Sequence, residues 1–179
     1  MRSRLFLSTL ALATLATASS ARAEEPRYYL AATSSAASDY QLSADLGGEF
    51  AARFARRWWG HASIRVGGAM DAEGGGDHLE VRVGVDHERC NASGRLCGLA
   101  GIDLGYQAST WDHGDFGPVE HHSGLLAAPH LGLDMGGQRL RLRLLAEGRA
   151  YLHHSETPTK SSTRLEPGVG LSAALAYRF

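Results

Sequence analysis

The chain ends inside a strand pattern. The segment LSAALAYRF, from Leu171 to Phe179, alternates apolar residues with small or charged ones up to the last position. A period of two is that of a β-strand whose two faces meet different surroundings. Soluble domains usually end in a few frayed polar residues. The alternation therefore predicts a last strand that is paired to its end, and it raises the question of what the apolar face contacts.

The first residues predict export. MRSR is a short basic segment, LFLSTLALATLA is an apolar stretch that is short for a membrane helix, and ARA, ending at Ala23, is a small-x-small cleavage site. These parts are typical of a secretory signal peptide, the alternative being an uncleaved anchor. We therefore expect a signal peptide over residues 1–23 and one domain over residues 24–179.

Charge and hydropathy narrow the choice of partners. The chain has 18 Lys and Arg against 19 Asp and Glu, and loss of Arg2, Arg4 and Arg22 with the signal peptide makes the rest more acidic. A mildly acidic domain is not expected to bind nucleic acid. After residue 24 no apolar run approaches the ~20 residues that a membrane helix needs. The domain is therefore expected to be soluble or to cross a membrane by other means.

Alternating segments follow one another along the remaining chain, whereas helical patterns are scarce. They predict eight strands, over residues 27–34, 40–54, 58–70, 78–87, 98–108, 123–135, 139–153 and 165–179. The connections FARRW and MGGQR are tight, whereas SAASD, DAEGGGD, STWDHGDFGPVEHH and HSETPTKSST are longer and polar. Short periplasmic turns that alternate with longer outer loops are typical of an up-and-down membrane barrel. ERCNASGRLC is longer than its place in this scheme predicts.

Residue types indicate which face of the strands points outward. Residues 139–153 set Leu140, Leu142, Leu144 and Leu152 against Arg141, Arg143, Glu147 and Arg149. The interior of an eight-stranded barrel is only wide enough for side chains to fill, and paired charges with small residues suit that space. Aromatic residues at strand ends suit membrane interfaces, and they are Tyr28, Tyr40, Trp58, Tyr106, Tyr177 and Phe179. We expect an all-β, eight-stranded antiparallel transmembrane β-barrel, closed because unpaired backbone groups in lipid cost several kcal/mol.

With these features the chain resembles the small eight-stranded outer-membrane β-barrels, of the outer-membrane protein A and protein X type. In that class the last strand typically ends in Phe after alternate apolar residues, and the barrel-assembly machinery reads it as an insertion signal. The matching positions here are Leu171, Ala173, Leu175, Tyr177 and Phe179. The resemblance implies a monomer in the outer membrane of a Gram-negative bacterium, in contact with membrane lipid and lipopolysaccharide.

The polar face predicts a network of charges inside the barrel. Its members are Asp45, Glu49, Arg53, Arg65, Glu80, Arg82, Asp86, Asp103, Asp134, Arg141, Arg143, Glu147 and Arg149. Such a set either lines an ion path or forms a plug of mutual salt bridges. The narrow interior of an eight-stranded barrel favours the plug.

Cys90 and Cys97 are the two cysteines of the chain. An even number in an exported protein predicts a disulfide, the alternative being two free thiols. The bond would close the overlong turn ERCNASGRLC. His87 lies nearby, but these residues leave the ligand set of a zinc site incomplete.

Two further patterns bear on chemistry at the outer end. His121 and Ser123 are similar in spacing to residues of the outer-membrane lipid A deacylases, in which His and Ser act with a carboxylate. HHSGLL lacks the rest of that pattern, and no acid stands at the expected place in the next strand. Imidazoles in outer loops or at the outer ends of strands are able to bind Zn²⁺ or Cu²⁺, although no ligand spacing is visible among His78, His113, His121, His122, His153 and His154. We expect no metal and no cofactor.

These observations favour a structural or surface-recognition protein rather than an enzyme. The longest loop carries Trp111 and Phe116 in a polar setting, which makes it a candidate recognition tip. Three alternatives stay open. They are a narrow pore for ions or small solutes, a lipid-modifying hydrolase that uses His121 and Ser123, and a soluble secreted β-barrel that binds an apolar ligand.

Overall fold

The computed structural model describes residues 26–39, 41–70, 75–112, 120–157 and 160–179. The predicted signal peptide lies outside these residues, as do Tyr40, His113 and Phe116. In the described part of the chain, no helix is long and apolar enough to cross a membrane.

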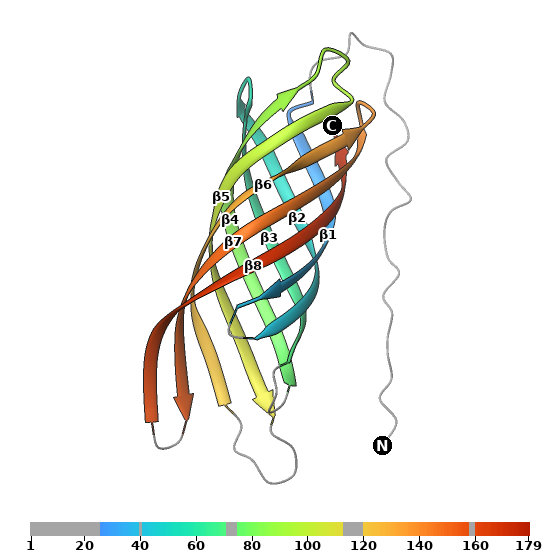
Figure 1. The fold of residues 1–179 in the computed structure, drawn as a ribbon. Coiled ribbons are helices and arrows are strands. Elements are labelled where there is room, and N and C mark those ends of the chain that lie inside the picture. Colours follow the sequence, from blue (N-terminus) through green and yellow to red (C-terminus); the bar gives the residue numbers. More distant parts are fainter. Residues whose placement is uncertain (1–25, 40, 71–74, 113–119, 158–159) are drawn as a thin grey trace, which may run out of the picture.

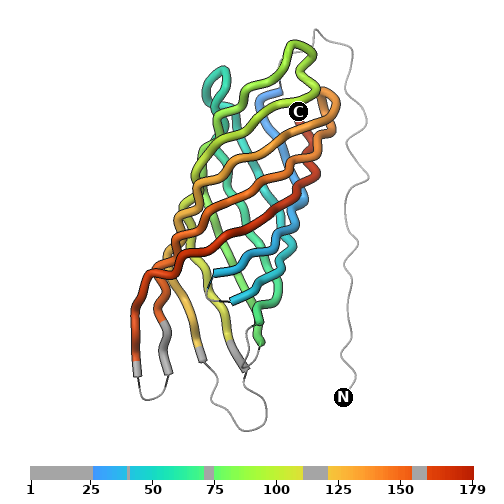
Figure 2. The backbone as a smooth tube through the Cα atoms, in the orientation of Figure 1, coloured from blue at the N-terminus to red at the C-terminus, as the bar shows by residue number. Residues whose placement is uncertain are grey.

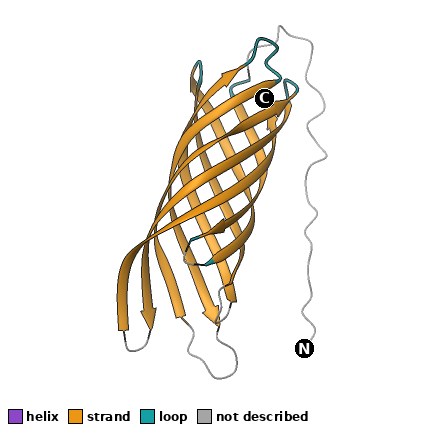
Figure 3. Ribbon diagram, in the orientation of Figure 1, coloured by secondary structure: helices purple, strands orange, loops and turns teal. Residues whose placement is uncertain are grey.

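The described chain is a closed barrel in which each strand pairs antiparallel with its neighbours and β1 pairs with β8 (Figures 1 and 3). This confirms the predicted fold class. The strands are β1 (Tyr28–Ser38), β2 (Leu42–Ala55), β3 (Trp58–Met70), β4 (Gly75–Cys90), β5 (Leu96–Asp112), β6 (Glu120–Gly136), β7 (Leu140–Thr157) and β8 (Lys160–Arg178).

Seven strands differ in their bounds from the sequence prediction, and β3 has the predicted ones. The first strand, predicted to end at Ser34, continues to Ser38. At the other extreme, β7 and β8 pair as far as Thr157 opposite Lys160, through polar residues predicted to form a long loop. Figure 2 shows these ends extending well past the connection between β1 and β2. The sequence predicted a longer loop because two paired strands with polar residues on both faces show no alternation of hydropathy.

The barrel has two different ends. We call the terminal end the one that carries the first described residues, Phe179 and the turns at residues 56–57, 91–95 and 137–139; the opposite one is the loop end. The sheet closes at the terminal end, where Tyr28 N donates to Phe179 O at 3.0 Å and Phe179 N donates to Tyr28 O at 2.9 Å. The last strand is thus paired to its final residue.

The apolar face of the strands points out of the barrel and the charged face points in. Leu46 and Leu131 are 68% and 67% exposed, whereas Arg82 and Glu80 are each 1% exposed. Other exposed apolar residues occur on all eight strands, among them Leu30, Ile64, Val83, Leu104, Leu125, Leu142 and Leu175. This arrangement is the inverse of a soluble barrel.

Candidate functional site

The interior of the barrel is the most distinctive feature of the described structure, because it is filled by ionised side chains. Glycines on the inner face make room for them. A Cβ on Gly84 would meet Asp103 Oδ1 and would lie 2.5 Å from His61 Nε2, and one on Gly101 would lie 2.5 Å from both Asp86 Oδ1 and His130 Nε2. The interior is therefore packed rather than open at the level of these glycines.

Near the terminal end, two arginines converge on Asp134. Arg178 Nη2 lies 2.6 Å from Asp134 Oδ2 and 2.7 Å from Glu88 Oε2. Arg141 donates to Asp134 and also to the backbone oxygen of Gly94 at 2.8 Å. Because Arg178 is on β8 and Glu88 is on β4, this group spans the lumen from one wall to the opposite one.

A second group lies around Arg143. Its guanidinium lies 2.8 Å from Glu49 Oε1 and 2.5 Å from Asp86 Oδ2, and it also contacts the Tyr29 hydroxyl, which donates to Glu49. Asp86 Oδ1 accepts a 2.6 Å hydrogen bond from His130 Nε2. Arg143 on β7 thus joins side chains from β1, β2 and β4.

His61 connects this group to Asp103. Its Nε2 lies 2.7 Å from Asp103 Oδ1, and its Nδ1 lies 3.4 Å from Asp86 Oδ2. Both ring nitrogens thus face carboxylate oxygens in a buried site, so the imidazole bridges two acids on neighbouring strands.

The third group is centred on Arg82. Its Nη1 and Nη2 donate to the two oxygens of Glu147 at 2.6 and 2.9 Å, and its Nε donates to Glu80 at 2.6 Å. Arg149 donates to Glu147, Glu80 and Gln107 at 2.7 to 3.0 Å. The bidentate contact from β4 to β7 crosses the lumen, and paired geometry of this kind is the strongest form of ion pair.

Among the described residues, the interior carries fewer paired charges closer to the loop end. His78 Nδ1 lies 3.2 Å from Asp45 Oδ1, and His122 Nδ1 lies 2.8 Å from His153 Nε2. His78 and His153 are 3% and 2% exposed. These two histidines, predicted to lie at the outer ends of strands, are inner-face residues, because each alternates in step with the lumen charges of its own strand.

The predicted network residues all lie in this interior or at its rim. Arg65 Nη1 lies 3.5 Å from Glu80 Oε1. Arg53 is only half-buried, and its guanidinium stacks 4.7 Å from the centre of the Trp59 ring. Sequence reasoning omitted several members from the network, namely Tyr29, His61, Glu88, Gln107, His130 and Arg178. Alternation along the strand was the available signal for Glu88, which continues the series of Glu80, Arg82 and Asp86.

Cys90 and Cys97 form a disulfide across the β4–β5 hairpin. They are directly opposite residues of the two strands. Glu88, Cys90 and Cys97 are also the one cluster of three close potential metal ligands among the described residues, and the disulfide occupies both sulfurs.

The predicted hydrolase residues do not form a catalytic arrangement in the described structure. His121 is exposed at the loop end of β6, and Ser123 is half-buried two positions along the same strand. Within the described residues, no hydrogen bond joins their side chains. His122, between them, is the residue that points inward and contacts His153.

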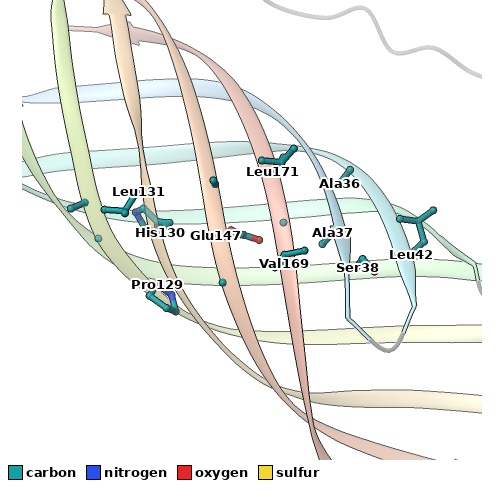
Figure 4. A pocket seen from close by; sticks show the side chains of 15 residues that line it. Ala36, Ala37, Ser38, Leu42, Pro129, His130, Leu131, Glu147, Val169 and Leu171 are labelled. Atoms are coloured by element: carbon teal, nitrogen blue, oxygen red, sulfur yellow. The ribbon is translucent and has the colours of Figure 1, made fainter.

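A shallow groove of about 800 Å³ crosses the outer surface of the barrel (Figure 4). Its floor is made of small residues such as Ala36, Ala146 and Gly148, and Leu131 and Leu171 border it. The surface of the groove is almost entirely apolar; His130 and Glu147, which also line it, are buried and face the interior of the barrel.

A scan against protein-family models found no match, and a search of curated proteins found none. Solved structures do match. Neisserial surface protein A is similar with a TM-score of 0.65 and 11% identity over 87% of this chain and 98% of that one. The chain has the fold of the small eight-stranded outer-membrane β-barrels.

Two other structures support that assignment of the fold. The N-terminal β-barrel domain of Pseudomonas aeruginosa OprF has a TM-score of 0.54 and 12% identity, covering 85% of this chain and 99% of that one. Ail, the attachment invasion locus protein of Yersinia pestis, has a TM-score of 0.50 and 16% identity, covering 87% and 100%. At these identities the likeness concerns architecture alone.

Proposed function

We propose that this protein is an integral outer-membrane β-barrel with a plugged interior and a structural or surface-recognition role. The observation that carries the proposal is the inverted barrel, with exposed aliphatic side chains on every strand and ion pairs inside. An exposed apolar face of this extent is unstable in water and stable in lipid. A soluble barrel with an apolar pocket does not fit, because the described interior is charged.

The plug follows from contacts that span the lumen. Arg82 with Glu147, Arg143 with Glu49, and Arg178 with Glu88 each join strands on different sides of the barrel. Charges held at hydrogen-bond distance leave little room for a hydrated ion. We therefore favour a closed barrel over the narrow pore, with the loop end as the part that meets other molecules.

The proposal includes assembly by the barrel-assembly machinery as a monomer. The last strand presents Leu171, Leu175 and Phe179 on its outward face, and the Phe179 ring packs at a tilt against Tyr28 with ring centres 5.9 Å apart. Outer-membrane lipid and lipopolysaccharide are the proposed surroundings. The non-enzymatic role rests on the separated positions of His121 and Ser123.

The membrane location is tested by fractionation and by gel mobility with and without boiling. We expect the protein in the outer-membrane fraction, with a shift in mobility on boiling. A salt-extractable protein without a shift would overturn the proposal.

An exposed leucine supplies a sharper test. Leu46→Lys places a charge at an outward site that is harmless in water but costs about 2–4 kcal/mol in the middle of a bilayer. We expect this loss in urea unfolding from vesicles. Gln138→Lys, in the exposed turn at residues 137–139, is the control and is expected to unfold like the unaltered protein. Equal stability of the two variants would argue that Leu46 faces water.

A further inference from the structure

The terminal end carries a ring of exposed arginines, which we call the arginine rim. It consists of Arg27, Arg56, Arg57, Arg89, Arg95 and Arg139. Among the described residues of this end no acidic side chain is exposed, because Glu88 and Asp134 point inward and pair with Arg178. The protein as a whole carries slightly more acids than bases, so this end is a local concentration of positive charge.

The rim is fixed to the sheet by backbone hydrogen bonds. Glu88 N donates to Arg57 O at 2.8 Å, Gly136 N donates to Arg95 O at 2.9 Å, and Arg178 N donates to Arg139 O at 2.7 Å. Arg27 N donates to Phe179 O at 3.1 Å. The arginines therefore stand at defined places around the barrel edge rather than on a loose tail.

Aromatic side chains lie next to the rim on the outward face. Tyr28 lies between Phe50 and Phe179, with ring centres 6.1 and 5.9 Å apart, and Trp58 directly follows Arg57. Amphipathic aromatic rings settle at the level of lipid headgroups. The rim is thus placed where the phosphates of the nearer leaflet lie, and the long arginine side chains are able to reach them.

We propose that the arginine rim binds the headgroups of anionic phospholipids in the leaflet at the terminal end. The inference rests on the proposed membrane location. Arginine forms bidentate hydrogen bonds with phosphate oxygens, and each basic residue near an anionic bilayer favours association by roughly fivefold. The loop end offers no equivalent ring, since its exposed described charges include Asp77 as well as Arg164, and Arg164 lies 2.6 Å from Glu166.

The test is reconstitution into vesicles of equal phosphatidylglycerol and phosphatidylcholine, followed by mild detergent extraction and mass spectrometry of the retained lipid. Both leaflets contain both lipids, so the direction of insertion does not matter. We expect the unaltered protein to retain several-fold more phosphatidylglycerol than phosphatidylcholine, and the enrichment to fall in 0.5 M salt because exposed charges are screened to within about 3–5 Å.

Matched double variants identify the site. Arg56→Gln with Arg57→Gln is expected to bring the ratio of the two retained lipids most of the way to one. Lys160→Gln with Arg164→Gln removes the same charge near the loop end and is expected to leave the enrichment unchanged. Enrichment that is absent from the unaltered protein, or that survives equally in both variants, would overturn the proposal.

Two further measurements separate other outcomes. Sedimentation with purified peptidoglycan tests an acidic cell-wall partner, and binding there without lipid enrichment would overturn the inference. Gel mobility on boiling reports insertion of each variant. If the unaltered protein does not insert, the proposed membrane location fails; if it inserts without lipid preference, only the arginine rim is wrongly assigned.

Discussion

Arg82 illustrates how single residues hold the interior together. It is buried and meets Glu147 with two nitrogens and Glu80 with a third. A charge taken out of water is stable only while its partners satisfy it. The identity of such partners is hidden from the sequence, because Arg82 and Glu147 are 65 positions apart and meet only when the barrel closes.

Replacing Arg82 by Met is expected to lower the free energy of unfolding by about 3–5 kcal/mol, since Glu80 and Glu147 lose three short hydrogen bonds and are left to share Arg149. Urea unfolding in lipid vesicles measures the change. Arg164→Met is the control, because Arg164 forms an exposed pair with Glu166 of the kind worth at most about 1 kcal/mol. Similar losses in the two variants would show that Arg82 is solvated.

Gly84 tests whether the interior is full. A Cβ at this position would meet the side chains of Asp103 and His61 and would lie 2.8 Å from the backbone oxygen of Ile102. Gly84→Ala is expected to cost about 1–3 kcal/mol, as overpacking does. Gly148→Ala is the matched control, since a Cβ there meets nothing within 4 Å. The midpoints of thermal unfolding of the two variants measure this cost. Equal midpoints would indicate that the interior has space for a methyl group at Gly84.

At the scale of elements, the alternation in the sequence was sufficient to predict the number, order and facing of the strands. It gave β3 the bounds Trp58–Met70 that the structure shows. It failed where β7 and β8 run on to Thr157 and Lys160, because polar residues on both faces leave no period to detect. Likewise His78 and His153 were placed at the outer ends of predicted strands and were not included in the interior network, although their alternation with Glu80 and Arg149 places them inside.

The β4–β5 hairpin is the element that a disulfide closes. Replacing Cys90 and Cys97 by Ser is expected to lower the free energy of unfolding by about 2 kcal/mol. The disulfide closes a short loop and so lowers the conformational entropy of the unfolded chain. The hairpin itself should persist, because Asn91 N still donates to Leu96 O at 2.9 Å. Urea unfolding with and without a reductant measures the effect. The reductant should destabilise the unaltered protein and leave the variant unchanged. An effect of the reductant on the variant would show that the loss of stability does not come from this disulfide.

On the scale of the whole molecule, closure of the sheet into a barrel places its two faces in two different environments. The outward face is a continuous apolar surface, and the inward face brings acids and arginines from opposite walls within hydrogen-bond distance. The two ends of the barrel also differ in charge, since the arginine rim lies at the terminal end. Sequence parity predicts which residues face inward, but only the closed geometry decides whether the interior conducts.

Planar-bilayer recording tests whether the interior conducts ions. The unaltered protein is expected to give no steady conductance, because Arg82 and Glu147 bridge the lumen at 2.6 Å with Arg149 packed beside them. Changing both to Ser removes one of the three sets of contacts that span the lumen, so brief openings are expected to become more frequent, while the contacts of Arg143 and Arg178 still narrow the path. Arg164→Ser with Glu166→Ser, which removes an ion pair of the same composition from the exposed loop end, should stay silent. If the unaltered barrel conducts as well as the first variant, the ion pairs line a pore rather than seal it, and the narrow pore becomes the better account of the charged interior.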